Sequence, residues 1–327
     1  MARERRGNAS TITPPQALLQ AGVAAAATGL VYGTLYERNN YHVRRVELPL
    51  LPPGTSPVSI LHVSDLHMLP HQRAKIAFLT RLGRLDPDFV INTGDNLSSD
   101  KAVPTVARAL SPLLAKPGAF VFGSNDYFAP IPKNPLSYLG LGKKRHSEIP
   151  LPWRDLRAAF TEHGWEDATH RKLSFSLNGA RILVAGVDDP HMGADDYSSI
   201  AGPAGPGFDV RIGLTHSPEP RVLDAFDADG YDLALAGHTH GGQVCLPTGA
   251  IVTNCGIDRS RVKGVSAWGR NLTLHVSAGI GNSPYVPVRT FCRPEASLIV
   301  LTPQKSRGHR APASPLPSSA REPLSVG

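Results

Sequence analysis

The stretch "VSILHVSDLH", residues 58–67, runs from a short apolar segment directly into two potential metal ligands, Asp65 and His67. A short run rich in Val, Ile and Leu is typical of a strand that is buried within a sheet. Asp65 and His67 stand at positions i and i+2, so their side chains point the same way on extended backbone. The stretch therefore predicts a buried strand that delivers two ligands to one place at its end.

The same arrangement recurs between about Val46 and Leu301. Further apolar runs end in Gly94 and Asp95, in Asn125 and Asp126, in Asp188 and Asp189, in His216, and in His238 and His240. Helical patterns lie between them, over Lys75–Leu85, Val103–Ala115, Trp153–His163 and the segment after Pro218. This alternation predicts an α/β fold, and ligands of such folds bind beyond the carboxyl ends of the strands.

The polar residues at these strand ends indicate a metal site when they are taken together. A single Asp or His in such a place more often caps a turn or packs in the core. Jointly, carboxylates and neutral imidazoles suit divalent Mn, Fe, Zn or Co. The candidates are Asp65, His67, Asp95, His216, His238 and His240.

The order of these motifs resembles the signature of the calcineurin-like metallophosphoesterases. The chain has D-x-H at Asp65–His67, G-D at Gly94–Asp95, a G-N-H-D-like turn, a lone His216, and G-H-x-H at Gly237–His240. The segments "GVDDP" and "GHTHGGQV", followed by "VSAGIG", resemble a bacterial branch of that superfamily. The resemblance covers residues 55–303. It implies a four-layer α/β/β/α sandwich in which two mixed sheets are flanked by helices.

The resemblance also implies a dinuclear metal-dependent phosphoric ester hydrolase. Two divalent metal ions would be bridged by Asp95. One site would be completed by Asp65, His67 and His240, and the other by His216, His238 and the asparagine of the third motif. A water or hydroxide that bridges the ions would attack a phosphomonoester or phosphodiester, while the ions neutralise its oxygens.

The third motif, in "FVFGSNDYF" at residues 120–128, departs from the family. Counted from Gly123, Ser124 falls on the metal-binding asparagine, and Asn125 falls on the histidine that contacts phosphate. Either the loop shifts by one residue and Asn125 supplies an amide oxygen, or Ser124 is a weak ligand and Asn125 only binds the phosphate. We favour the first, because a neutral hydroxyl is a poor ligand, and assign Asn125 and Asp95 as catalytic.

Loss of a general acid typically costs about 10²–10⁴-fold in rate. His191 and His146 are candidates to replace the missing histidine, although each also fits an ordinary loop position. The insertion at residues 129–152 carries a basic cluster, Lys143, Lys144 and Arg145. It is either a substrate wall or a solvated loop. We predict His191 and Arg145 as substrate-binding residues.

The chain divides into three parts. Residues 1–45 form a basic and apolar segment, residues 46–302 the metallophosphoesterase domain, and residues 303–327 a Pro/Ser-rich tail that we expect to be disordered. Residues 18–35 carry no charge, and they fit a membrane anchor, a cleaved signal segment or a soluble helix. An anchor would place the protein at the cell membrane; the alternative is the cytoplasm.

The net charge of +7 does not indicate nucleic-acid binding. Five of the seven excess charges lie in the two tails, so we expect no nucleic-acid partner, and a nuclease of the same superfamily is disfavoured. The expected substrate is a phosphorylated small molecule or lipid. The three cysteines form no C-x-x-C pair and are expected to be buried thiols. Because the motif histidine is missing, a weak or inactive metal-binding interaction module on the same fold is the alternative function.

Overall fold

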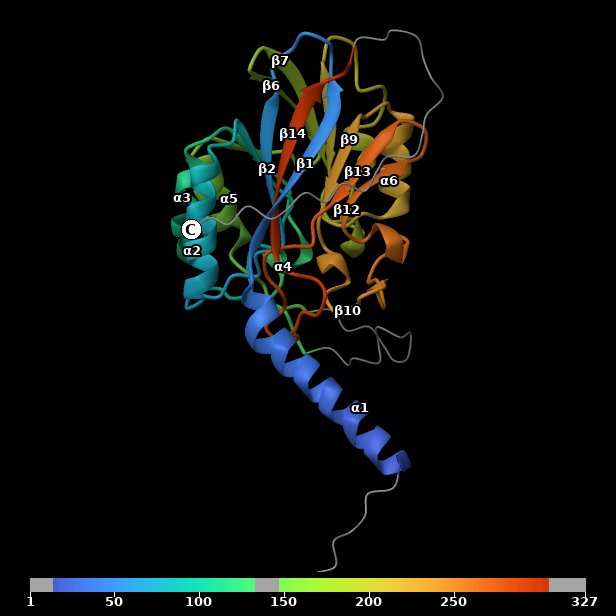
Figure 1. The fold of residues 1–327 in the computed structure, drawn as a ribbon. Helices are drawn as coiled ribbons and strands as arrows, with labels where there is room; N and C mark the ends of the chain where they lie inside the picture. The colour runs from blue at the N-terminus through green and yellow to red at the C-terminus, as the bar shows by residue number, and fades with distance from the viewer. Residues whose placement is uncertain (1–13, 133–146, 306–327) are drawn as a thin grey trace, which may run out of the picture.

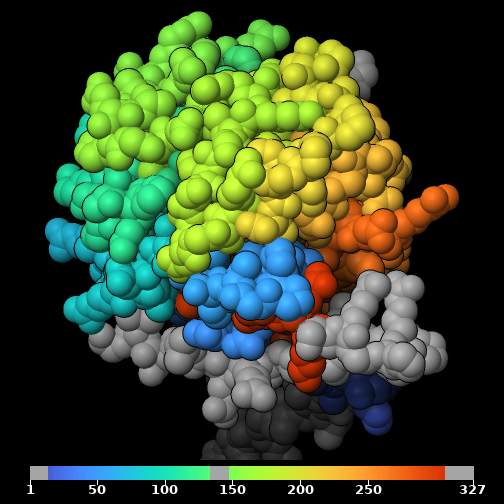
Figure 2. All heavy atoms as spheres, turned by 90° about the horizontal axis from the view of Figure 1, so that it is seen from above, coloured from blue at the N-terminus to red at the C-terminus, as the bar shows by residue number. Residues whose placement is uncertain are grey.

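Two six-stranded sheets stack face to face, with helices on their outer faces (Figure 1). The computed structural model describes residues 14–132 and 147–305. Viewed from above, the teal helical residues lie on one side of the molecule, and the yellow and orange residues of the second sheet and its cover lie on the other (Figure 2). The predicted four-layer α/β/β/α fold is confirmed.

The first sheet has the order β1-β14-β2-β3-β4-β5. Its strands are β1 (His42–Leu51), β14 (Glu295–Pro303), β2 (Val58–Val63), β3 (Phe89–Asn92), β4 (Gly118–Phe120) and β5 (Trp165–Asp167). All neighbours are parallel except β14 and β2, which are antiparallel. Because β1 begins at His42, the sheet starts before the predicted domain boundary at residue 46.

The second sheet has the order β12-β13-β9-β8-β7-β6. Its strands are β12 (Gly264–Trp268), β13 (Leu272–Val276), β9 (Leu233–Ala236), β8 (Val210–Leu214), β7 (Ala180–Gly186) and β6 (Arg171–Leu177). The four central strands run parallel, and the strand at each edge is antiparallel to its neighbour. This sheet is mixed as well, as predicted.

The helices cover the outer faces where the sequence places them. Three pack on the first sheet: α2 (Arg73–Leu82), α3 (Val103–Leu114) and α5 (Trp153–Thr161). The second sheet is covered by α6 (Pro220–Ala228). Short elements complete the described chain: α4 (Ser124–Tyr127), β10 (Cys245–Leu246), β11 (Gly249–Ala250) and single-turn helices at Gly83–Leu85, Pro190–Met192, Tyr197–Ser199, His240–Gly242 and Arg259–Arg261.

The apolar runs of the sequence become strands that are buried on both faces. In β2, Val58 and Ile60 face the second sheet, whereas Leu61 and Val63 face the helices. The parallel strands are near-continuous apolar runs because neither face meets water. Three apolar cores hold the four layers together, and the carboxyl ends of the parallel strands lie together at one end of the sandwich.

A long helix precedes the first sheet. Helix α1 (Pro14–Val31) has no buried residue and projects from one end of the body (Figure 1). A π-helical turn, η1 (Tyr32–Tyr36), and a 3-10 turn, η2 (Glu37–Asn39), join it to β1. Within the described residues, one helical stretch, Pro14–Asn39, is long and apolar enough to cross a membrane, by length and composition only.

Two smaller expectations concern the cysteines and the tail. Cys245 and Cys292 are buried and Cys255 is half-buried, and all three are free thiols. The predicted tail lies almost wholly outside the described residues, which end at residue 305.

Candidate metal centre

Loops from both sheets bring all seven predicted ligands to one end of the sandwich. Asp65 and His67 follow β2, Asp95 follows β3, Asn125 lies in α4 after β4, His216 follows β8, and His238 and His240 follow β9. Each loop leaves the carboxyl end of a parallel strand, where the sheet topology places ligand sites. The first sheet supplies the carboxylates, and the second supplies three of the four histidines.

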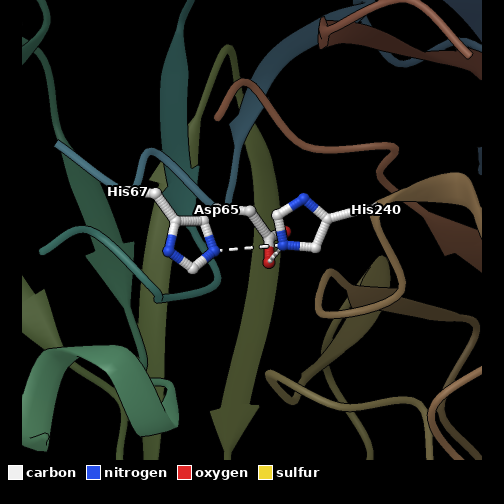
Figure 3. A group of neighbouring side chains, drawn as sticks. All are labelled: Asp65, His67 and His240. Carbon is white, nitrogen blue, oxygen red and sulfur yellow. Dashed lines mark hydrogen bonds and ion pairs between the residues drawn. The ribbon is translucent and has the colours of Figure 1, made fainter. Parts of the chain in front are cut away.

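Asp65, His67 and His240 form one group of potential ligand atoms, which lie within 4.8 Å of one another (Figure 3). The Nε2 atoms of the two histidines face each other at 3.0 Å, and His240 Nε2 lies 3.5 Å from Asp65 Oδ1. His240 Nδ1 donates to the carbonyl of Gly281 at 3.0 Å, which leaves the lone pair of a neutral ring on Nε2. Burial lowers the pKa of His67 to about 4 and that of His240 well below its ordinary value. Two neutral imidazoles that face each other so closely suit a cation between them.

Asp65, Asp95 and His216 form a second group, which shares Asp65 with the first. His216 Nε2 lies 3.4 Å from Asp95 Oδ1, and His67 Nε2 lies 3.4 Å from Asp95 Oδ2. The two oxygens of Asp95 therefore face histidines of different groups. His216 Nδ1 donates to the carbonyl of Thr93 at 2.7 Å, which directs Nε2 to the centre.

The acidic residues attract positive charge to this place. Burial favours neutral forms, but the neighbouring Asp95 and Asp189 outweigh it and raise the pKa of His216 well above its ordinary value. Burial raises the pKa of Asp65 to about 6; burial also acts to raise the pKa of Asp95, but the neighbouring His216 outweighs it and lowers that pKa well below its ordinary value. A divalent cation matches the need of these carboxylates for a positive partner.

His238 closes the cluster on the side of the second sheet. Its main-chain N–H donates to both oxygens of Asp65, at 3.0 and 3.1 Å, and its Nδ1 lies 3.3 Å from His216 Nε2. Its Nε2 is buried without a hydrogen-bond partner. A buried imidazole nitrogen is rarely left unpaired in a protein interior, so His238 fits a ligand position.

The third-motif loop lies directly against the cluster. The main chain of Asn125 donates to Asp95 Oδ1 and its side-chain amide to Asp95 Oδ2, both at 2.7 Å. Ser124 instead donates its main-chain N–H to Asp189 at 3.0 Å. A Cβ atom at Gly123 would lie 2.3 Å from Asp95 Oδ1, so this close approach requires glycine.

Asp126 fastens two ligand loops together. Its carboxylate accepts hydrogen bonds from the main-chain N–H groups of Asp95 at 2.9 Å, Asn96 at 2.7 Å and Gly123 at 3.0 Å. Burial, and then the charge of Asp95, raise the pKa of Asp126 to about 7. The acid of the third motif thus positions the loops after β3 and β4, a role that the sequence did not indicate.

The ligand loops hold a strained backbone. Among the described residues, ten non-glycine residues have positive φ, and five of them are Asp65, His67, Asp95, His238 and His240. Such a conformation costs on the order of 1–3 kcal/mol per residue and clusters at functional sites. The surrounding hydrogen bonds stabilise these backbone conformations, and the side chains converge as a result.

His191 lies at the edge of the centre. Its ring centroid is 4.4 Å from that of His238, and its Nδ1 is 4.0 Å from a carboxylate oxygen of Glu219. Asp189 accepts from its main-chain N–H at 2.9 Å. The structure therefore brings His191 to the predicted ligands, whereas Arg145 and His146 fall in the part of the chain that is not described.

Two buried cations support the ligand loops through main-chain carbonyls. Arg289 donates to Ala278 and Gly279, and its Nη2 lies 3.3 Å from His240 Nδ1. Lys75 Nζ donates to the carbonyl of Leu66 at 2.6 Å and to that of His67 at 3.2 Å. No motif in the sequence indicates either residue, because neither follows a strand and their partners are main-chain atoms.

A buried polar chain supports Asp65 from between the two sheets. Ser64 donates to Asp65 Oδ2 at 2.7 Å, and Thr93 donates to Ser64 at 2.8 Å. His62 contacts Thr93 at 2.9 Å and His275 of the second sheet at 3.2 Å. Such supporting contacts orient a ligating carboxylate. No sequence motif indicates this series of contacts, since His62 and His275 are 213 residues apart.

The sequence profile of the calcineurin-like phosphoesterases matches residues 58–242, which is more than half of the chain. The chain belongs to this family. The matched region contains every residue of the cluster, from Asp65 to His240. A metal-dependent phosphoesterase is therefore the general activity that the family and the candidate ligands support.

Three relatives extend this result. Protein YpbG of Bacillus subtilis is 27% identical over 281 residues, which cover 85% of this chain and 93% of YpbG. Phosphodiesterase YaeI of Escherichia coli is 26% identical over 291 residues, which cover 86% of this chain and 97% of YaeI. A transmembrane protein with a metallophosphoesterase domain from Bos taurus is 29% identical over 234 residues, which cover 65% of this chain and 48% of that protein.

Proposed function

We propose that this protein hydrolyses a phosphomonoester or phosphodiester at a centre of two divalent metal ions. The observation that carries the proposal is the position of Asp95, whose two oxygens each lie 3.4 Å from a histidine of a different ligand group. A carboxylate so placed suits a bridge between two ions. The substrate would be a phosphorylated small molecule or lipid.

The residues fit two ions. Asp65, His67 and His240 would hold one, and His216, His238 and Asn125 would hold the other, with Asp95 between them. The Nε2 of His238 has no hydrogen-bond partner, and the Nε2 atoms of His67 and His240 face each other at 3.0 Å, so all three nitrogens are placed to serve as ligands. Bound there, two divalent ions would supply a hydroxide nucleophile at neutral pH and neutralise charge on the phosphoryl oxygens.

The protein's own groups would position the ester. Asn125 is half-buried beside Asp95, and its side chain would face the phosphate or one ion. His191, whose side chain is 20% exposed, would donate a hydrogen bond to the leaving-group oxygen. A second candidate function is an inactive metal-binding module on the same fold. The observation that supports it is the absence of the histidine from the third motif.

Metal content and turnover of the full chain test the proposal. We expect two ions per chain, and turnover of p-nitrophenyl phosphate or its bis ester with Mn²⁺. Asp95→Ala should lose both ions and all turnover, because it removes the shared carboxylate. Glu162→Ala, an exposed helix-end acid, is the control and should keep both. Bound metal without turnover of either ester would favour the inactive module.

The N-terminal helix supports a location at the cell membrane. The stretch Pro14–Asn39 has the length and apolar composition of a membrane span, and α1, its first part, has no buried residue. An apolar helix that packs on nothing in its own chain needs another apolar environment. We therefore propose that it anchors the protein; sedimentation of the full chain with the membrane fraction after alkaline washing tests this, and a soluble protein would support the cytoplasmic alternative.

A further inference from the structure

Exposed apolar side chains are concentrated at one end of the molecule. The described chain exposes fifteen large apolar residues, and eight of them lie on residues 18–36. Five more lie on two loops near the metal centre and are here called the apolar rim: Val244, Leu246, Ile251, Tyr285 and Phe291. Contiguous apolar surface of this kind marks a site of contact with a partner or a membrane.

The apolar rim is continuous with the base of α1. The main chain of Arg289 donates to the carbonyl of Gly33 at 3.2 Å, and a Cβ at Gly33 would lie 2.5 Å from the Arg289 carbonyl. On its other side, the loop pairs with the β10 segment through Val244 and Thr290 and through the hydrogen bond from Cys245 to Thr290. Figure 1 shows α1 and β10 at the same end of the body. The helix base and both rim loops thus form one surface.

The same surface borders the metal centre. Arg289 lies between Tyr285 and Phe291 in sequence and contacts the ring of His240. Gln243 donates to the carbonyl of Val286 at 2.9 Å, which ties the rim loops together beside His240. A surface that touches the rim would therefore lie next to the candidate ligands.

The backbone holds one rim side chain outward at a cost. Phe291 has a φ of 50° and is 60% exposed. A positive φ is a genuine outlier for a bulky residue. The next residue, Cys292, is fixed by its hydrogen bond to the buried Glu37 at 2.6 Å. The backbone therefore holds the Phe291 ring at the surface, where most of it packs against no other part of the protein.

The composition of this surface fits an anionic bilayer. Tyr32 and Tyr36 lie in η1, directly after α1, and tyrosine is enriched where spans meet the lipid interface. Lys263 donates to the carbonyl of Phe291, and Arg259 donates to that of Ile251. Basic side chains beside inserted apolar residues attract anionic headgroups.

We propose that the apolar rim inserts into the interface of the anionic bilayer that α1 enters, so that the metal centre takes a phosphoester carried by a lipid of that bilayer. The contact with the bilayer is independent of catalysis, while the lipid substrate rests on the proposed function. A bilayer is favoured over a protein partner because the rim continues from the base of the candidate membrane span.

Bromolipid quenching tests the contact. The full chain is reconstituted in vesicles of phosphatidylcholine and phosphatidylglycerol, with and without brominated acyl chains, as the variants Phe291→Trp and Ser56→Trp. Ser56 lies in the β1–β2 connection at the opposite end and is the matched control. With the signal of the native tryptophans subtracted, residue 291 should be quenched by bromolipid and residue 56 should not. An unquenched residue 291 would overturn the proposal and leave the rim to a protein partner or a second copy.

Activity on two kinds of substrate tests the consequence. The double variant Leu246→Asp/Phe291→Asp should lose about tenfold or more on phosphatidic acid or phosphatidylglycerol in vesicles, because two buried apolar contacts are removed. Its turnover of soluble bis-p-nitrophenyl phosphate should be unchanged, and Ser56→Asp should affect neither substrate. A wild type that hydrolyses only the soluble ester would overturn the lipid substrate. A wild type that hydrolyses neither would contradict the proposed function, while quenching at residue 291 still decides the contact.

Discussion

The contacts of Asn125 support one of the two readings that the altered third motif leaves open. The side-chain amide of Asn125 donates to Asp95, while Ser124 donates its main-chain N–H to Asp189 and its hydroxyl lies 3.5 Å from the Asn125 amide nitrogen. The sequence left two registers open, since neighbouring residues of a tight turn can exchange roles and no periodicity decides between them. The partners of this turn, Asp189 and Asp95, lie on other loops, so its contacts follow only from the tertiary structure.

Paired alanine variants distinguish the two registers. If Asn125 is a ligand, Asn125→Ala should lose one of the two ions. The affinity for that ion should fall by at least about 10–100-fold, the loss that is typical when a residue supporting a metal ligand is removed. Ser124→Ala should keep both ions. Metal titration of each variant gives the answer, and the reverse result would assign Ser124 as the ligand.

His191→Ala tests the proposed contact with the leaving group. Its kcat should fall by about 10²-fold or more on phenyl phosphate, a poor leaving group, and much less on p-nitrophenyl phosphate. Metal content should stay the same, because His191 belongs to neither group of potential ligand atoms. An equal fall on both substrates would remove His191 from this role.

The sequence patterns predict strands but not which strands pair. The strands that precede the ligands were predicted, because each is an apolar run that ends in a polar residue. The contact between β1 and β14 was not, because its partners lie about 250 residues apart and no local pattern links them. A buried ion pair fastens this contact: Glu295 accepts from Arg44 Nη2 at 2.9 Å and lies 3.5 Å from His42.

This ion pair predicts a loss of stability in acid. Burial alone would raise the pKa of Glu295, but Arg44 outweighs it and lowers the pKa. The contribution to stability is therefore present above the ordinary glutamate pKa of about 4.3 and is lost as the pH falls through the lower folded value. Glu295→Gln should lower the free energy of unfolding by about 1–3 kcal/mol at pH 7. This is less than for a fully buried pair, because Arg44 is 33% exposed. The variant should also lose less stability than the wild type as the pH falls.

Urea unfolding between pH 3 and 7 with a chelator present measures this effect. Glu47→Gln is the control, because its pair with Arg45 on the same strand is exposed and is worth little. Equal pH profiles for wild type and Glu295→Gln would contradict the prediction.

The complete sandwich depends on a centre that both sheets share. Carboxylates come from loops of the first sheet, and three histidines come from loops of the second. The sequence predicted this convergence because the motif order is shared with a family, while the supporting residues Arg289, Lys75 and His275 carry no motif. Their positions follow only from the packed tertiary structure.

Metal removal should therefore weaken the whole molecule. A chelator should lower the midpoint of thermal unfolding, since an ion at about 100 times its Kd stabilises the folded state by about 2.7 kcal/mol. Asp95→Ala should be insensitive to the same chelator. Calorimetry of both proteins with and without chelator measures the difference, and an unchanged wild-type midpoint would contradict a metal link between the sheets.

The place of β14 in the first sheet has a consequence for biosynthesis. This strand is among the last parts of the domain to leave the ribosome, yet it lies between β1 and β2, which are among the first. Until it arrives, β1 has no neighbour in its sheet, and Arg289 is not available to support His240. If α1 is the membrane anchor proposed above, it can reach the lipid early during translation, whereas the metal centre forms only after nearly the entire domain has been made. A nascent chain would thus be tethered before it is able to act on any ester.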